Sequence, residues 1–208
     1  MDLTYLGAGC VKLSGKSLTL VCDPLKADAG MAKASAKADA VTFSQESLTG
    51  VETSALVIDG PGEYEVKGAM ITGVPARLHL DEDGNRCTIY SIVLDGFNVV
   101  VLGNMFGELS ASQVDKLGRV DVLVVPVGNH GLTLDAEAAS ALIRQLEPSY
   151  VVPVHYDDGH TKYEVAQDGV EVFLKEMGVT VETIAKLKVS PRDLPEQPQV
   201  VVLQRAGA

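Results

Sequence analysis

Residues 150–160, with the sequence YVVPVHYDDGH, join a short apolar run to a group of polar side chains that could do chemistry. The apolar run is typical of a buried strand, and the polar residues follow at its end. Together with a histidine in the loop GNHG, the side chains that could bind a metal are His155, Asp157, Asp158, His160 and His130. Histidine and aspartate are common zinc ligands. The same residue types also build solvated turns, so a mononuclear metal site and ordinary loop structure are both open interpretations.

Cysteine could supply a different chemistry. Cys10 follows a glycine turn, and with a histidine such as His155 close by it could act as a nucleophile. A small buried packing residue is the alternative interpretation. The chain has three cysteines, an odd number, without any CxxC spacing, which favours free thiols in a reducing compartment over a disulfide framework. We therefore expect a cytoplasmic protein.

The first half of the chain contains short β-branched or alternating runs that predict strands, separated by Gly, Pro and Asp. These runs are residues 2–6, 17–22, 40–44, 55–59, 68–74, 87–95 and 98–103. Asp95-Gly96 predicts a tight hairpin turn, and Asp23 in CDPL predicts a turn carboxylate that accepts backbone hydrogen bonds. The glycines of GPGEYEV predict a sharp turn between sheets. The Ala/Lys stretch 28–40 fits either a helical turn or a surface loop.

The second half alternates helices with strands. Helices are predicted over 109–118, which begins with a capping-box pattern, over 133–148, and over 163–178, where Gly169 interrupts the pattern. Apolar runs at 121–128, 150–155 and 199–205 predict strands. Strands first and then alternating helices and strands predict an α/β (α+β) fold in which helices face two sheets. Without a repeat or a linker, we expect a single domain over 1–208.

Composition narrows the classes of partner. The chain has 208 residues, 46% of them hydrophobic, and a formal charge of −11 without any Lys/Arg stripe. Such a surface repels nucleic acid and anionic lipid. Because no window approaches 18 uninterrupted apolar residues, no membrane-spanning segment is expected either. A small molecule in a cleft, or another copy of the chain in a homo-oligomer, remains as a partner.

Three segments carry a resemblance to a known family. They are TYLGAGCVKLSGKSLTLVCDPL (4–25), VIDGPGEYEVKGAMITGVPARLH (57–79), and the run from 99 to 139 that leads to VVPVHY (151–156). Together they resemble the metallo-β-lactamase superfamily in its L-ascorbate-6-phosphate lactonase-like branch, over residues 3 to about 205. The resemblance implies an αββα sandwich with its site at the sheet edge where loops meet. It also implies hydrolysis by two zinc ions, held by His and Asp, that activate a bridging water.

The family's ligand positions carry mostly other residues here. The position of the histidine after the first glycine turn is Ala8, and that of the bridging aspartate is Asn104. The family's cluster of two histidines, an aspartate and a histidine falls on Gln45, Ser47, Thr49 and Gly50. Two positions match: His79 falls near the isolated mid-chain histidine, and His155 matches the final one. In the family these two serve different metal ions.

Three functional hypotheses follow. The favoured one is a binding or scaffolding protein that has lost the dinuclear zinc site and has no cofactor, with the old cleft receiving a small ligand. The second is a lactonase-like or phosphoesterase-like hydrolase with a rebuilt zinc site around His155, His79 and His130, in which Asn104 donates to a developing oxyanion. The third is a structural role in a homo-oligomer.

Overall fold

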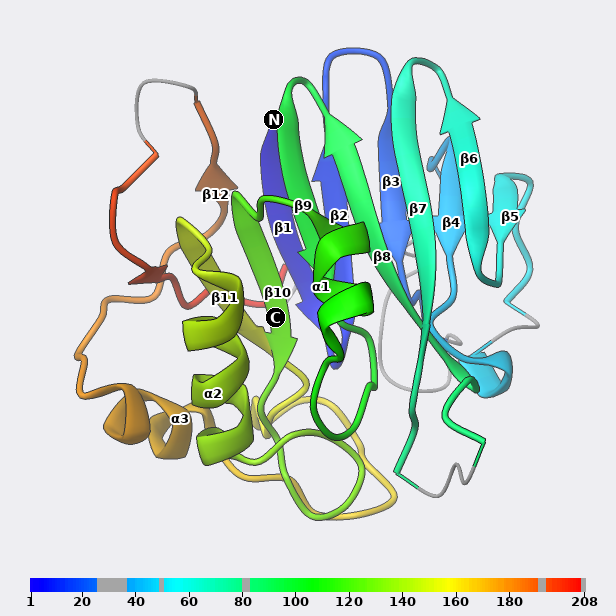
Figure 1. Ribbon diagram of the computed structural model, residues 1–208. Coiled ribbons are helices and arrows are strands. Elements are labelled where there is room, and N and C mark those ends of the chain that lie inside the picture. The colour runs from blue at the N-terminus through cyan, green and yellow to red at the C-terminus, as the bar shows by residue number, and fades with distance from the viewer. Residues whose placement is uncertain (26–36, 49–50, 80–82, 191–193, 207–208) are drawn as a thin grey trace.

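The computed structural model describes residues 1–25, 37–48, 51–79, 83–190 and 194–206, which form two β-sheets packed against each other (Figure 1). The first sheet has six strands in the order β12-β1-β2-β3-β4-β5. Its strands are β1 (Asp2–Gly7), β2 (Cys10–Ser14), β3 (Thr19–Cys22), β4 (Ala40–Thr42), β5 (Leu56–Ile58) and β12 (Leu187–Lys188). A short 3₁₀ helix, η2 (Glu46–Leu48), follows β4.

The second sheet has seven strands in the order β13-β11-β10-β9-β8-β7-β6. Its strands are β6 (Gly62–Val66), β7 (Ala69–Ala76), β8 (Cys87–Leu94), β9 (Phe97–Val101), β10 (Val122–Pro126), β11 (Tyr150–Val154) and β13 (Gln199–Val200). Every residue of β10 and β11 is buried, as their continuous apolar sequences predict for strands covered on both faces. Side chains from both sheets share one hydrophobic core. The predicted two-sheet α/β fold is confirmed.

Three α-helices are described: α1 (Ala111–Leu117), α2 (Ala136–Leu146) and α3 (Val170–Met177). Figure 1 shows α1 and α2 lying on the seven-stranded sheet. The predicted capping box of α1 is present, since the Ser110 hydroxyl accepts from Gln113 N and the Gln113 side chain accepts from Ser110 N. No helix in these ranges is long and apolar enough to cross a bilayer.

Three local predictions were wrong or only partly right. The helix predicted over 163–178 begins only after Gly169, which is its N-cap, because glycine there ends the preceding loop in an extended conformation. The glycines of GPGEYEV do lie where the chain turns from one sheet to the other, between β5 and β6, but Gly62–Val66 also forms the edge strand β6. The closing strand 199–205 shortens to Gln199–Val200. Most of the Ala/Lys stretch, residues 28–36, lies outside the described residues.

The strand directions bring several loops to one edge of the sandwich. Strands β3, β4 and β5 are parallel to one another, as are β9, β10 and β11. The carboxyl ends of parallel strands meet at one edge, where ligand sites form between the connecting loops. The loops that follow β1, β3, β4, β9, β10 and β11 begin with or contain Ala8, Asp23, Gln45, Asn104, Gly128 and His155.

Candidate functional site

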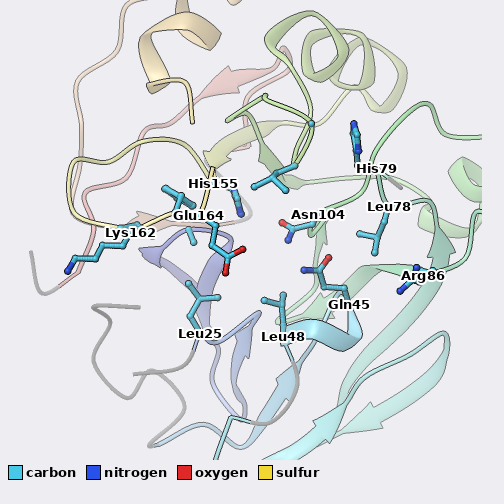
Figure 2. Close-up of a pocket in the computed structure, with 15 residues that line it drawn as sticks. Leu25, Gln45, Leu48, Leu78, His79, Arg86, Asn104, His155, Lys162 and Glu164 are labelled. Carbon is cyan, nitrogen blue, oxygen red and sulfur yellow. The ribbon is translucent and has the colours of Figure 1, made fainter. Parts of the chain in front are cut away.

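A pocket of about 630 Å³ lies at this loop-bearing edge (Figure 2). It is lined by Ala8, Leu25, Gln45, Leu48, Leu78, His79, Arg86, Asn104, Gly131, Leu132, His155, Thr161, Lys162, Tyr163 and Glu164. The lining includes five positions that the sequence assigned to the metal site of the resembled family: Ala8, Gln45, His79, Asn104 and His155. The side chain of Ser47 and residues Thr49 and Gly50 lie outside the described part of the structure.

Strained backbone is concentrated around this pocket. Ala8 and His155, which both line it, have φ of 48° and 52°, and His155 N donates to the Ala8 carbonyl at 2.7 Å. Asn129 and His130, in the loop beside the lining residue Gly131, have φ of 64° and 54°. A positive φ is uncommon outside glycine, and such conformations gather at ligand and active sites. The backbone at this edge is therefore built like that of a functional site.

Asp23 links two of the loops at this edge of the sandwich by a hydrogen bond. Its Oδ1 accepts from Ser44 N at 2.6 Å, which confirms the structural role that the sequence predicted for this residue. Gly103 packs so tightly on the same loop that a Cβ atom there would come within 2.2 Å of Ser44 Cβ. Burial raises the pKa of Asp23 to about 6, although hydrogen bonds from Ser44 oppose the rise. The loops that carry Gln45 and Asn104 are thereby held in fixed positions.

His155 reaches the pocket with one edge of its ring only. The residue is 9% exposed, and its Nδ1 is buried without a hydrogen bond of good geometry. Burial lowers the pKa of His155, while two neighbouring acceptors, its own carbonyl and the Gln167 side chain, oppose this. A buried imidazole with a lowered pKa is neutral at pH 7. The part of the ring that faces the pocket lies away from Nδ1, on the Nε2 side.

The other two predicted imidazole ligands have protein neighbours of their own. The His79 ring packs edge-on against Phe106, with centroids 4.8 Å apart, and its Nε2 lies against the backbone of Gly131. His130 is not in the pocket lining, and its Nε2 is 2.9 Å from Asp168 Oδ1. The structure therefore places His79 and His155 in one pocket and turns His130 to a carboxylate instead.

The carboxylates of YDDGH lie in a different place from His155. Asp157, Asp158 and His160 line a separate pocket together with Tyr5 and Arg205. Asp158 accepts from His160 N, from Thr161 N and from the Thr161 hydroxyl, and it pairs with Arg205 at 3.8 Å. These contacts satisfy the carboxylate through its own loop and Arg205. The structure does not assemble the mononuclear cluster that would combine these residues with His155 and His130.

Cys10 belongs to a small buried cluster with Val21, Val41 and Phe43. It is fully buried, and burial raises the pKa of its thiol well above the usual range. A thiol kept protonated and out of contact with solvent is not a nucleophile, so the alternative interpretation, a packing residue, describes Cys10. Cys22 and Cys87 are buried in their strands in the same way.

The sequence did not point to Glu164, which contributes the only carboxylate among the described residues that line the pocket. It lies in the loop between β11 and α3, where no motif marks it. A dinuclear zinc centre requires several imidazoles and a bridging carboxylate. Across the described ranges, no group of three or more His, Cys, Asp or Glu side chains is arranged to hold a metal ion.

The family model for the β-lactamase superfamily domain matches residues 2–155. The chain belongs to the metallo-β-lactamase superfamily. The matched segment ends at His155, one of the residues that line the pocket.

Individual members of the superfamily are similar over most of the chain. A UPF0173 metal-dependent hydrolase of Thermococcus onnurineus is 32% identical over 159 residues, which are 74% of this chain and 66% of the relative. A UPF0173 metal-dependent hydrolase of Methanoculleus marisnigri is 27% identical over 91% of this chain and 92% of its own length. A solved structure from Thermotoga maritima, classed provisionally as a Zn-dependent hydrolase of the superfamily, has 28% identity, a TM-score of 0.79 and 98% coverage of both chains.

Proposed function

We propose that this member of the metallo-β-lactamase superfamily is a binding protein whose pocket has replaced the dinuclear zinc centre. One observation carries the proposal: the positions expected to hold zinc line a well-formed pocket but include Ala8, Gln45 and Asn104. Zinc in proteins is bound by thiolate, imidazole and carboxylate. A methyl group and two neutral amides cannot replace these ligands or offset the charge of two divalent cations.

The expected loss of metal affinity supports the proposal that the dinuclear zinc centre has been lost. Losing one group that merely orients a ligand costs about 10–100-fold in metal affinity. Here the sequence replaces most of the ligands themselves, at Ala8, Gln45 and Asn104 in the pocket and at further positions after β4. Two remaining imidazoles, His79 and His155, would serve different ions in the resembled family, so neither ion would keep a full set of ligands.

The preserved pocket supports a binding role for the chain. Its volume of about 630 Å³ lies in the usual range of small-molecule sites, roughly 300–1,000 Å³. Leucine side chains supply apolar walls, and a few polar groups converge between them, which is the usual composition of such a site. The backbone at Ala8 and His155 is also strained, at a cost of roughly 1–3 kcal/mol per residue, and such strain gathers at ligand sites.

A metal-dependent hydrolase is the second candidate, because the relatives from Thermococcus onnurineus and Methanoculleus marisnigri carry that name. In this chain the metal would be a single ion bound by His155 and Glu164, with Asn104 as a hydrogen-bond donor beside it. The narrower lactonase-like assignment would belong to this second candidate, as a reaction in which a lactone ring is opened.

Thermal denaturation with zinc separates the two candidates. A ligand at 100 times its Kd stabilises the native state by about 2.7 kcal/mol, which for a chain of this size raises Tm by roughly 5 °C or more. We expect the wild-type chain and His155→Ala to respond equally weakly to added zinc, and neither to hydrolyse simple lactones or phosphodiesters. A zinc-dependent rise in Tm that disappears in His155→Ala, together with zinc-dependent hydrolysis, would establish the hydrolase instead.

A further inference from the structure

The carboxylate of Glu164 points into the pocket, between His155 and the leucines of its floor (Figure 2). In the described part of the chain it makes no hydrogen bond or ion pair, although nearby side chains carry positive charge. Lys162 extends away from the centre of the pocket. Arg86 lies at the opposite side beside Leu78 and also lines an adjoining pocket with Asp59 and Glu46. The negative charge of Glu164 is therefore available to a ligand.

His155 offers a second hydrogen-bond acceptor to the pocket. The amide nitrogen of Gln167 donates to the carbonyls of Val165 and Ala166, at 3.1 and 3.0 Å, so its Oε1 is turned the other way. This oxygen and Nδ1 of His155 are both buried without a hydrogen bond of good geometry, and the Gln167 side chain is close enough to His155 to act on its pKa as an acceptor. An oxygen that only accepts favours a hydrogen on Nδ1. In that tautomer Nε2 carries a lone pair on the side of the ring that faces the pocket, and Gln167 acts as a positioning residue.

Two side-chain amides complete the polar part of the pocket. Gln45 and Asn104 extend into it from loops after β4 and β9 and lie near each other in Figure 2. Neither amide forms a side-chain hydrogen bond within the described ranges. Each can present its oxygen as an acceptor. The walls around these groups are apolar, formed by Leu25, Leu48 and other leucines.

We propose that the ligand of this pocket is an organic ammonium ion, a protonated primary or secondary amine with a compact apolar body; this inference rests on the binding function proposed above. An ammonium group has hydrogens to donate to Glu164, to Nε2 of His155 and to an amide oxygen. Its apolar body packs against the leucines. The formal charge of −11 on the whole chain also draws cations toward the surface and repels anions.

Three probes of one shape test the head group: cyclohexylmethylamine, cyclohexylmethanol and cyclohexanecarboxylate, which are positive, neutral and negative at pH 7. Each is titrated into the full chain and followed by amide-resolved NMR at moderate salt. Glu164→Gln removes the charge with little change in shape. Glu65→Gln is the matched control, since Glu65 is exposed on β6 and absent from the lining of the pocket.

We expect the amine to bind most tightly, with shifts centred on Ala8, Asn104 and His155. Glu164→Gln should weaken it by about tenfold or more, as loss of a hydrogen bond to a charged group does, while Glu65→Gln has no effect. Equal or tighter binding of the alcohol or the carboxylate, an unchanged affinity in Glu164→Gln, or no binding of the amine would overturn the ammonium assignment.

A separate arm with zinc chloride keeps this inference distinct from the proposed function. Binding of the carboxylate or alcohol in the pocket, without zinc binding, would leave a binding protein with a different ligand. Zinc binding at His155 that displaces the amine and switches on hydrolysis would overturn the binding function itself. Failure of all three probes, with stoichiometric zinc in the same pocket, would overturn both.

Discussion

His155 and Asp158 stand three residues apart in one loop, yet they have opposite relations to the protein around them. Asp158 is saturated by His160 N, Thr161 N, the Thr161 hydroxyl and Arg205. His155 reaches a different pocket, and its buried Nδ1 has no hydrogen bond of good geometry. One polar group therefore stabilises the loop, whereas the other makes no such contact with the protein. Residue type alone does not distinguish these two residues. Their hydrogen-bond and ion-pair partners do.

The same contrast appears between two carboxylates. Burial raises the pKa of Asp158, but the hydrogen bonds from Thr161 and His160 and the charge of Arg205 more than offset it, so the pKa is lowered overall. Asp23, in the loop after β3, has no cationic partner among the described contacts, and burial raises its pKa to about 6. The charge of Asp158 is compensated by its neighbours, whereas that of Asp23 is not. Mutations of Asp158 and of Asp23 should therefore change the stability of the fold in different ways.

The largest effect is expected from Asp158→Ala. The change removes three hydrogen bonds and leaves Arg205, whose side chain is 9% exposed, without this carboxylate. Breaking a buried ion pair by removing one partner costs about 3–5 kcal/mol, so the free energy of unfolding in urea should fall by roughly that amount. Asp157→Ala, which loses only the bond to Gly159 N, should cost about 1 kcal/mol. Equal costs for the two changes would contradict the assigned difference.

Asp23→Asn should change how stability depends on pH. A carboxyl whose pKa is raised by folding contributes stability below its unfolded value of 3.8, and this contribution is lost as pH rises through about 6. Asparagine keeps an acceptor for Ser44 N but does not ionise. The stability of Asp23→Asn relative to wild type should therefore increase between about pH 4 and pH 7, by up to about 3 kcal/mol, in urea unfolding at each pH. A constant difference across this range would show that Asp23 is not perturbed.

His155→Ala should destabilise the fold less than Asp158→Ala and should have a large effect on binding. The ring contributes no hydrogen bond of good geometry to the fold, so we expect the free energy of unfolding to change by about 1 kcal/mol or less beyond the packing that is lost. Binding of the ammonium probe should fall by about tenfold or more. If the variant unfolds as readily as Asp158→Ala, His155 has a structural role like that of its neighbour.

Much of the fold follows from the sequence because its signals are local. One physical interpretation fits the capping box of α1, and one fits the apolar runs of β10 and β11. The hairpin at Asp95-Gly96 needs a positive φ, which both residues adopt. The predicted helix does not extend before Gly169, because this residue is the extended N-cap at which α3 begins. Resemblance to the superfamily located the pocket, because Ala8, Gln45, His79, Asn104 and His155 all line it.

The side chains that line the pocket, and the partners of those beside it, could not be predicted in the same way. Glu164 lies in an irregular loop, so nothing in the spacing of residues shows that its side chain turns toward Gln45 and His155. The saturation of Asp158 depends on Arg205, which is 47 positions later, and on the local turn at Thr161. These relations depend on long-range packing, which single-residue patterns do not encode.

Elemental analysis tests the central claim most directly. The full chain is produced in zinc-supplemented medium, purified without chelators and without a metal-affinity tag, and its metal content per chain is compared with that of His155→Ala. We expect both proteins to be folded and to hold far less than one equivalent of zinc or any other transition metal. One or two equivalents in the wild type, lost in His155→Ala, would contradict the proposal that a ligand pocket has replaced the metal centre.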